Sequence, residues 1–127
     1  MVEPQLTALI VDDAEDMRLL LRRVLERADI KVVGEAVDGT DALRAIAELG
    51  PSPVDTVIVL DNMMPGLSGL EVAEQVLRDD PGLRIVLFTA YLSDEVAARA
   101  RALGIKASVS KSDLFDLPTL LLEAVRA

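Results

Sequence analysis

Polar side chains of three types stand at the ends of four apolar segments of this chain. Asp12 and Asp13 follow the first segment, Asp61 follows a later one, and Thr89 and Lys111 stand at the ends of two more. Three carboxylates that share a crevice repel one another strongly. A hard divalent cation relieves this repulsion, since Mg²⁺ typically binds one or two carboxylates together with water and phosphate oxygens. These residue types therefore suit metal-assisted transfer of a phosphoryl group.

In such chemistry Asp61 can be the nucleophile, because aspartyl phosphates are an established covalent intermediate. Mg²⁺, the Lys111 ammonium and the Thr89 hydroxyl could balance the charge on the phosphoryl oxygens. Each residue alone has a simpler explanation: a helix cap for Asp12 or Asp13, a turn for Asp61, and a surface or structural role for the other two. We prefer the chemical interpretation, because five suitable groups at four strand ends are an improbable coincidence.

Composition narrows the chemistry and the partners. The chain contains neither histidine nor cysteine, so a bound metal must have oxygen ligands, which favours Mg²⁺, Mn²⁺ or Ca²⁺. Acidic residues outnumber basic ones 22 to 13, which gives a formal charge of −9. Direct binding of nucleic acid depends on Lys and Arg, and anionic membranes also attract basic segments. We therefore expect neither, and a protein partner or a small metal-chelated ligand remains.

The length of 127 residues predicts one domain that spans residues 1–127. No apolar run reaches the ~18 residues of a membrane-spanning helix. Residues 1–6 lack the charged start and the apolar stretch of a secretory signal. We expect a soluble, cytoplasmic protein.

Continuous apolar runs alternate with segments of helical periodicity, as expected for strands buried on both faces and amphipathic helices. The predicted strands are 6–11, 31–37, 56–60, 84–90 and 107–110, and the predicted helices are 14–28, 40–49, 70–77, 93–103 and 114–125. Residues 50–53 should end the second helix. Five βα units predict an α/β fold, a doubly wound five-stranded parallel sheet with helices on both faces. With the flavodoxin-like order 2-1-3-4-5, the ligand crevice lies at the carboxyl ends of the strands.

Four motifs carry a family resemblance: Val-Asp-Asp at 11–13, Asp-Asn-Met-Met-Pro-Gly-Leu-Ser-Gly at 61–69, Phe-Thr-Ala at 88–90 and Val-Ser-Lys at 109–111. In order and spacing they resemble the receiver domains of two-component response regulators, and the resemblance covers nearly the whole chain. It implies these roles: phosphoacceptor for Asp61, direct Mg²⁺ ligand for Asp13, water-mediated ligand for Asp12, ligand through its backbone carbonyl for Met63, and phosphoryl binding for Thr89 and Lys111.

The resemblance also implies a histidine kinase or a phosphotransfer protein as donor. Output would pass through a C-terminal DNA-binding domain of a longer parent chain or through a separate protein, with a homodimer as a further possibility. The surface of the fourth helix, last strand and last helix would carry that output. The domain would be no enzyme beyond catalysing its own phosphorylation and dephosphorylation.

Two departures from the family pattern lie on either side of Lys111, and a third is the pair of bulky residues, Met63 and Tyr91, that flank the site. The switch residues implied by the family are the Thr, here Thr89, and an aromatic residue three positions before the Lys, where this chain has Ser108. We expect the coupled Thr–aromatic rotation to be absent or rerouted, with output through loop movement. Ser112 replaces the usual Pro after Lys111, so a cis peptide bond is not expected there.

Three other functions are conceivable for an α/β domain of this kind. A flavin phosphate would be repelled by the acidic loop at 12–16. Aspartyl phosphatases generally share an Asp-x-Asp motif. Here Met63 replaces the second Asp of that motif, so the acid that acts on the leaving group is missing. A degenerate receiver, which binds protein partners without phosphorylation, stays open.

Overall fold

In the part of the chain that the structure describes, residues 6–50 and 55–126 of a computed structural model, five parallel strands form one sheet in the order β2-β1-β3-β4-β5. The strands are β1 (Thr7–Val11), β2 (Lys31–Ala36), β3 (Thr56–Leu60), β4 (Arg84–Thr89) and β5 (Ala107–Ser110). The helices are α1 (Glu15–Arg27), α2 (Gly39–Leu49), α3 (Gly69–Asp79), α4 (Asp94–Leu103) and α5 (Leu117–Arg126), with a 3-10 helix (Lys111–Asp116) before α5. Within the described ranges, no helix has the length and apolar character needed to cross a membrane. The predicted fold class and strand order are confirmed.

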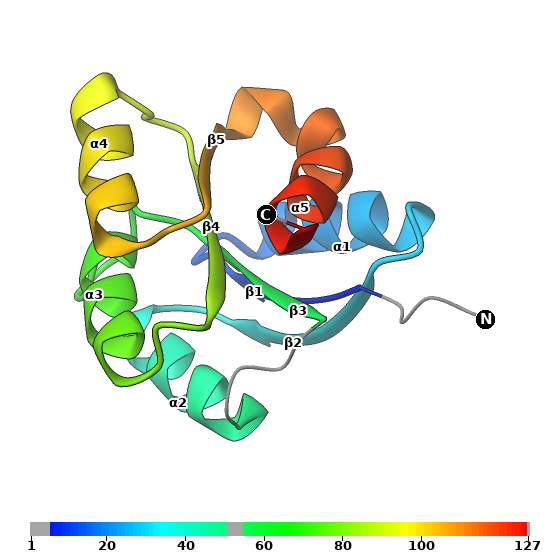
Figure 1. The fold of residues 1–127 in the computed structure, drawn as a ribbon. Coiled ribbons are helices and arrows are strands. Elements are labelled where there is room, and N and C mark those ends of the chain that lie inside the picture. The colour runs from blue at the N-terminus through cyan, green and yellow to red at the C-terminus, as the bar shows by residue number, and fades with distance from the viewer. Residues whose placement is uncertain (1–5, 51–54, 127) are drawn as a thin grey trace.

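Hydrophobic side chains cover both faces of the sheet, with α1 and α5 on one face and α2, α3 and α4 on the other (Figure 1). Leu9 and Ile58 pack on the side of α2, α3 and α4, whereas Ile10 and Val59 pack on the side of α1 and α5. Successive residues of a strand point to opposite faces. A strand between two helical layers must therefore be apolar at every position, which explains the continuous apolar runs of β1, β3 and β4.

Local capping residues set several helix boundaries. Ser68 starts α3 through a capping box, in which its side chain accepts from the Glu71 N–H and the Glu71 side chain accepts from the Ser68 N–H. Gly104, in the left-handed conformation, ends α4. At the predicted end of α2, Gly50 has a φ of 79°, while residues 51–53 lie outside the described residues. Apart from the start of the last helix, observed and predicted boundaries differ by at most two residues.

The last helix differs from its predicted range of 114–125. A 3-10 helix follows β5 directly, and α5 begins at Leu117. The Ser110 hydroxyl accepts from the Ser112 N–H at 3.2 Å and starts this turn. Asp113 has non-helical angles, φ −100° and ψ 27°, which separate the turn from a continuous α-helix. The helical periodicity of the sequence did not reveal this break, because Leu114 and Leu117 are both buried.

The carboxyl ends of four strands meet at one edge of the sheet. Val11 of β1 is the Cα partner of Leu60 in β3, and Leu60 is the partner of Leu87 in β4. Thr89, the last residue of β4, pairs with Ser110, the last residue of β5. The residues that follow these positions therefore lie at the same edge, which brings the sequence-predicted site residues together.

Candidate functional site

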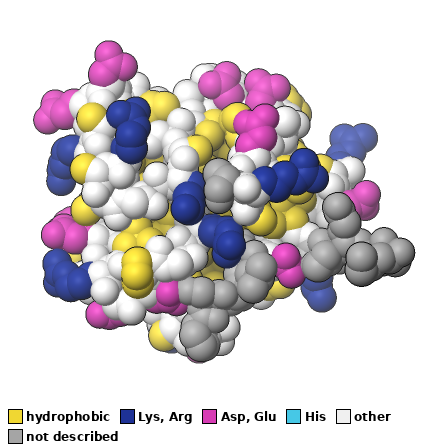
Figure 2. Space-filling model, viewed as in Figure 1, with side chains coloured by type: hydrophobic (Ala, Val, Ile, Leu, Met, Phe, Trp, Pro, Cys, Tyr) yellow, Lys and Arg dark blue, Asp and Glu magenta, His cyan; other side chains and the backbone are white. Residues whose placement is uncertain are grey.

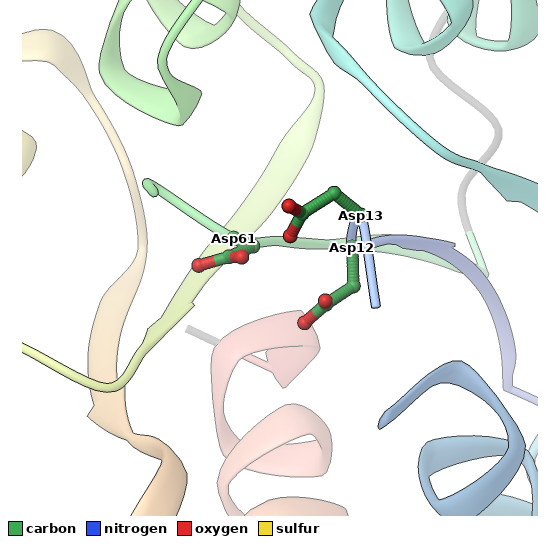
Figure 3. Close-up of side chains that lie close together, drawn as sticks. All are labelled: Asp12, Asp13 and Asp61. Atoms are coloured by element: carbon green, nitrogen blue, oxygen red, sulfur yellow. The ribbon is translucent and has the colours of Figure 1, made fainter. Parts of the chain in front are cut away.

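Three aspartates cluster at this edge, at the ends of β1 and β3. One carboxylate oxygen from each of Asp12, Asp13 and Asp61 lies within 4.8 Å of the other two. Asp12 and Asp61 are buried, whereas Asp13 is exposed at the rim. Figure 3 shows the Asp13 carboxyl group turned toward Asp61, with Asp12 below them. Hard oxygen donors at this spacing can hold a divalent cation.

Lys111 reaches the same cluster from the end of β5. Its Nζ lies 2.7 Å from Asp12 Oδ2 and 3.3 Å from Asp61 Oδ2. The Lys111 side chain is 17% exposed, and those of Asp12 and Asp61 are 1% and 3% exposed. One ammonium therefore contacts two buried carboxylates but neutralises the charge of only one, and with Asp13 beside them the cluster keeps an excess of negative charge. A cation that enters the site completes the neutralisation.

Burial and neighbouring charge shift the protonation of this cluster. Burial raises the pKa of Asp61 above its ordinary value, the Asp12 carboxylate adds to the increase, and Lys111 opposes both. Burial works to lower the pKa of Lys111, but its contacts with Asp12 and Asp61 outweigh it, so that this pKa is raised. In the metal-free protein the Lys111 ammonium is thus held in place, while the Asp61 carboxylate pays an electrostatic penalty.

Backbone N–H groups orient the two buried carboxylates. The Met63 N–H donates to Asp61 Oδ1 at 3.2 Å, and the Ala14 N–H donates to Asp12 Oδ1 at 2.9 Å. The helix-cap explanation for Asp12 is therefore confirmed only in part. Its side chain bonds the residue before α1, but the N-cap position belongs to Ala14, which makes no side-chain cap. Asp13 shows no capping hydrogen bond to α1 either.

The segment after Asp61 is folded back tightly onto α3. Asn62 ties its two ends together: its backbone oxygen accepts from the Gly69 N–H at 3.1 Å and its Oδ1 accepts from the Leu70 N–H at 3.0 Å. A Cβ at position 69 would overlap the Asp61 carbonyl oxygen and lie 2.9 Å from the Asn62 Cα. Both obstacles are backbone atoms, so glycine is required here for packing rather than for a positive φ.

Gly69→Ala is expected to displace the backbone of Asp61 and to lower the free energy of unfolding by about 1–3 kcal/mol, the usual cost of overpacking. Chemical denaturation measures this loss. Gly34→Ala is the matched control for added volume, since the glycine has no positive φ and a Cβ there would meet a side-chain atom, Leu9 Cδ1 at 3.1 Å, rather than backbone. Equal losses in the two variants would show that the Asp61 contact has no special cost.

The two residues implied as switch elements lie on neighbouring strands. Thr89 is completely buried, and its Oγ1 has no hydrogen-bond partner among the described residues. Ser108 is half-buried on β5, where it pairs with Leu87. The Lys111–Ser112 peptide bond is trans, as expected. An unsatisfied buried hydroxyl beside a charged crevice is a donor available to a ligand.

A contact that the sequence analysis missed comes from α1. Arg18 donates from Nη1 to the backbone oxygen of Asp12 at 2.7 Å and from Nε to Glu35 Oε1 at 3.2 Å. Helical periodicity placed Arg18 on α1, but no pattern in the sequence linked it to β2 or to the backbone of the acidic pair.

Known proteins resemble this chain over most of its length. A family model described as "Response regulator receiver domain" matches residues 8–122. Response regulator protein VraR of Staphylococcus saprophyticus is 35% identical over 105 residues, covering 82% of this chain and 48% of that protein. Chemotaxis protein CheY of Thermotoga maritima is 30% identical over 103 residues, covering 81% of this chain and 82% of that protein.

Solved structures share the fold. The signal receiver domain of the putative response regulator NarL from Mycobacterium tuberculosis aligns with a TM-score of 0.87 and 26% identity, covering 98% of this chain and 99% of that one. The chain spans 48% and 40% of the lengths of the first two curated relatives, VraR and LiaR. The segment that they share with this chain is therefore less than half of each relative.

Proposed function

Because this chain belongs to the response regulator receiver domain family, we propose that it is a phosphorylation-dependent switch. Asp61 accepts a phosphoryl group with the help of Mg²⁺, and the change alters a protein-interaction surface. The observation that carries this proposal is the cluster of Asp12, Asp13 and Asp61, with Lys111 in contact with two of the three carboxylates. Such a cluster is costly unless a cation and an anionic ligand use it.

The donor set fits Mg²⁺. All candidate ligands are oxygens, and the chain has neither histidine nor cysteine to favour a softer metal. Asp13 and Asp61 would hold the ion directly, Asp12 largely through water, and the backbone carbonyl of Met63 would complete the protein ligands. When bound, Mg²⁺ supplies positive charge that balances the oxygens of the transferred group.

The residues of the chain itself carry the transfer. A carboxylate oxygen of Asp61 attacks the phosphorus of a phosphohistidine in a histidine kinase or a phosphotransfer protein. The P–N bond breaks as the new P–O bond forms, and the departing imidazole takes up a proton. Lys111 Nζ, already 3.3 Å from Asp61 Oδ2, is placed to hold a phosphoryl oxygen, and the unpaired Thr89 hydroxyl donates to another.

The output surface is proposed to lie over α4, β5 and α5, the side shown in Figure 2, where Lys and Arg side chains gather near the centre. A hollow of about 210 Å³ lies beside Ser108, lined by Ala97, Arg101, Ile105, Lys106, Ala107 and Ser108. Thr89 and Ser108 are the proposed switch residues. Since position 108 has no ring to rotate, movement of Thr89 would reach this surface through the loops that flank β4 and β5.

The partners follow from the same proposal. The chain would receive its phosphoryl group in the cytoplasm from a histidine kinase or a phosphotransfer protein. Its output would be a C-terminal DNA-binding domain of a longer parent chain or a separate protein, with a homodimer as one form of the active state. Direct nucleic-acid binding by this domain is not expected, because its formal charge is −9.

The test is phosphorylation by a small donor. The protein is incubated with acetyl phosphate and Mg²⁺, and its intact mass is followed over time. We expect one added phosphoryl group that hydroxylamine removes, as it does from an acyl phosphate, and no addition with excess chelator. If neither acetyl phosphate nor a panel of histidine kinases modifies the protein, the chain is a degenerate receiver that binds partners without phosphate.

A further inference from the structure

Arg18 holds the loop after β1 against the neighbouring strand β2. Its Nη1 donates to the backbone oxygen of Asp12 at 2.7 Å, and its Nε donates to Glu35 Oε1 at 3.2 Å. The Arg18 side chain is 14% exposed and the Glu35 side chain 33%. A charged donor to a backbone carbonyl, itself anchored by a carboxylate, is among the stronger hydrogen-bonding arrangements at a partly buried position.

The carbonyl that Arg18 holds belongs to the peptide group that carries Asp13. A peptide group is planar, so a fixed Asp12 oxygen fixes the orientation of the Asp13 N–H and narrows the directions open to the Asp13 side chain. The Asp12 N–H donates to the Ala36 oxygen at 3.1 Å, and Asp12 Oδ1 accepts from the Ala14 N–H. Asp13 is exposed and has none of these restraints itself.

We propose that Arg18 is a positioning residue for the metal site: through the Asp12 carbonyl it directs Asp13 into the acidic cluster, with Glu35 as its anchor. This inference rests on the proposed function, since it assumes that Asp13 binds Mg²⁺. Outer groups that orient ligands commonly change metal affinity by about 10–100-fold when removed. Arg18 acts in this way on a backbone carbonyl rather than on a side chain.

The sign of the effect separates positioning from charge. Arg18 is a cation near the cluster, and a cation repels Mg²⁺. If Arg18 acted through its charge alone, its removal would tighten Mg²⁺ binding. If it only stabilised the fold, the folded protein would bind Mg²⁺ as before. Of these three roles, only positioning predicts weaker binding after the charge is removed.

Arg22 provides the matched control on the same helix. It shares the anchor, with Nη2 2.6 Å from Glu35 Oε2, and it also pairs with Glu26. Among the described residues, its hydrogen bonds go to Glu35 and Glu26 and not to Asp12. Arg22→Met therefore removes one positive charge, as Arg18→Met does, and two hydrogen bonds to Glu35 where Arg18→Met removes one, but it leaves the Asp12 carbonyl held.

Isothermal titration with Mg²⁺ alone measures the affinity of each folded variant. We expect Arg18→Met to bind Mg²⁺ about tenfold more weakly than wild type, and Arg22→Met to bind like wild type. Amide hydrogen exchange without metal is the second readout: the Ala14 amide should exchange faster in Arg18→Met and normally in Arg22→Met. If Arg18→Met does not fold, Arg18→Lys, which keeps the charge but lacks the fork that reaches both partners, should show the same loss.

Unchanged or tighter Mg²⁺ binding by Arg18→Met would overturn the inference while the proposed function stands, provided that wild type binds the ion. An equal loss in Arg22→Met would also overturn it, because the cause would then be the ion-pair network rather than the Asp12 carbonyl. If wild type itself does not bind Mg²⁺, the proposed function fails and the inference fails with it.

Discussion

Asp61→Asn is expected to abolish phosphoryl incorporation from acetyl phosphate and to stabilise the metal-free protein at neutral pH. The amide is isosteric with the carboxylate but is not a nucleophile that forms a stable acyl phosphate. Intact mass should show no added group under conditions that fully modify wild type. Modification of the variant at the wild-type rate would mean that another residue accepts the phosphoryl group and would contradict the assignment of Asp61.

The gain in stability follows from the raised pKa of Asp61. A carboxyl group whose pKa is higher in the folded protein than the ordinary 3.8 binds its proton more tightly when folded. The ionised carboxylate of Asp61 therefore destabilises the folded protein. This loss of stability is absent below pH 3.8, develops as pH rises through the folded pKa, and is fully present at neutral pH. The Asn variant lacks this penalty, and each kcal/mol gained raises Tm by about 4 °C for a domain of this size.

Thermal denaturation in chelator and in Mg²⁺ checks both halves of this prediction. Without metal, Asp61→Asn should melt at a higher temperature than wild type. With Mg²⁺, wild type should gain more than the variant, which has lost one ligand. Asp79→Asn, at an exposed position in the last turn of α3, is the control and should change stability by no more than about 0.5 kcal/mol. A lower Tm for Asp61→Asn in chelator would show that the Asp61–Lys111 pair outweighs burial.

Lys111→Met is expected to slow phosphorylation by a factor on the order of 10²–10³, the usual cost of removing one group that stabilises the transferred charge. It should also destabilise the metal-free protein by roughly 2–3 kcal/mol, somewhat less than the loss of one partner from a fully buried pair. Lys111 has its side chain 17% exposed, and without it the buried carboxylates of Asp12 and Asp61 face each other uncompensated.

Mg²⁺ should bind Lys111→Met more tightly than wild type, because the ammonium and the metal compete for the same carboxylates. The raised pKa of Lys111 means that its contribution to wild-type stability is fully present below the ordinary pKa of 10.5 and is lost as pH rises through the higher folded value.

Rates of phosphorylation from intact mass, and Tm values with and without Mg²⁺, measure the effects of Lys111→Met. Lys106→Met, at an exposed lysine just before β5, should behave like wild type. Phosphorylation of Lys111→Met at the wild-type rate would show that Lys111 does not stabilise the transferred phosphoryl group.

The sequence by itself determined the fold class and most element ranges, and the flavodoxin-like strand order assumed for such a fold was the one the structure shows. Unbroken apolar runs such as 56–60 can be buried only between two helical layers, and five of them separated by amphipathic helices admit few topologies. The edge of the sheet that holds the site follows from that topology, because parallel strands end together. The order of apolar runs and amphipathic helices along the chain was therefore enough to predict that Asp12, Asp61 and Thr89 lie at the same edge of the sheet.

Only the tertiary structure decided how these groups touch. The position of Lys111 Nζ between Asp12 and Asp61 depends on the 3-10 turn after β5, which helical periodicity did not predict. The contact from Arg18 to the Asp12 carbonyl joins a side chain to a backbone atom. Every residue has the same backbone atoms, so no residue type in the sequence indicates such a contact. Hydrophobic patterning specifies which face of each element is buried, whereas these polar contacts depend on how the packed elements meet, and that is settled only when the whole core has formed.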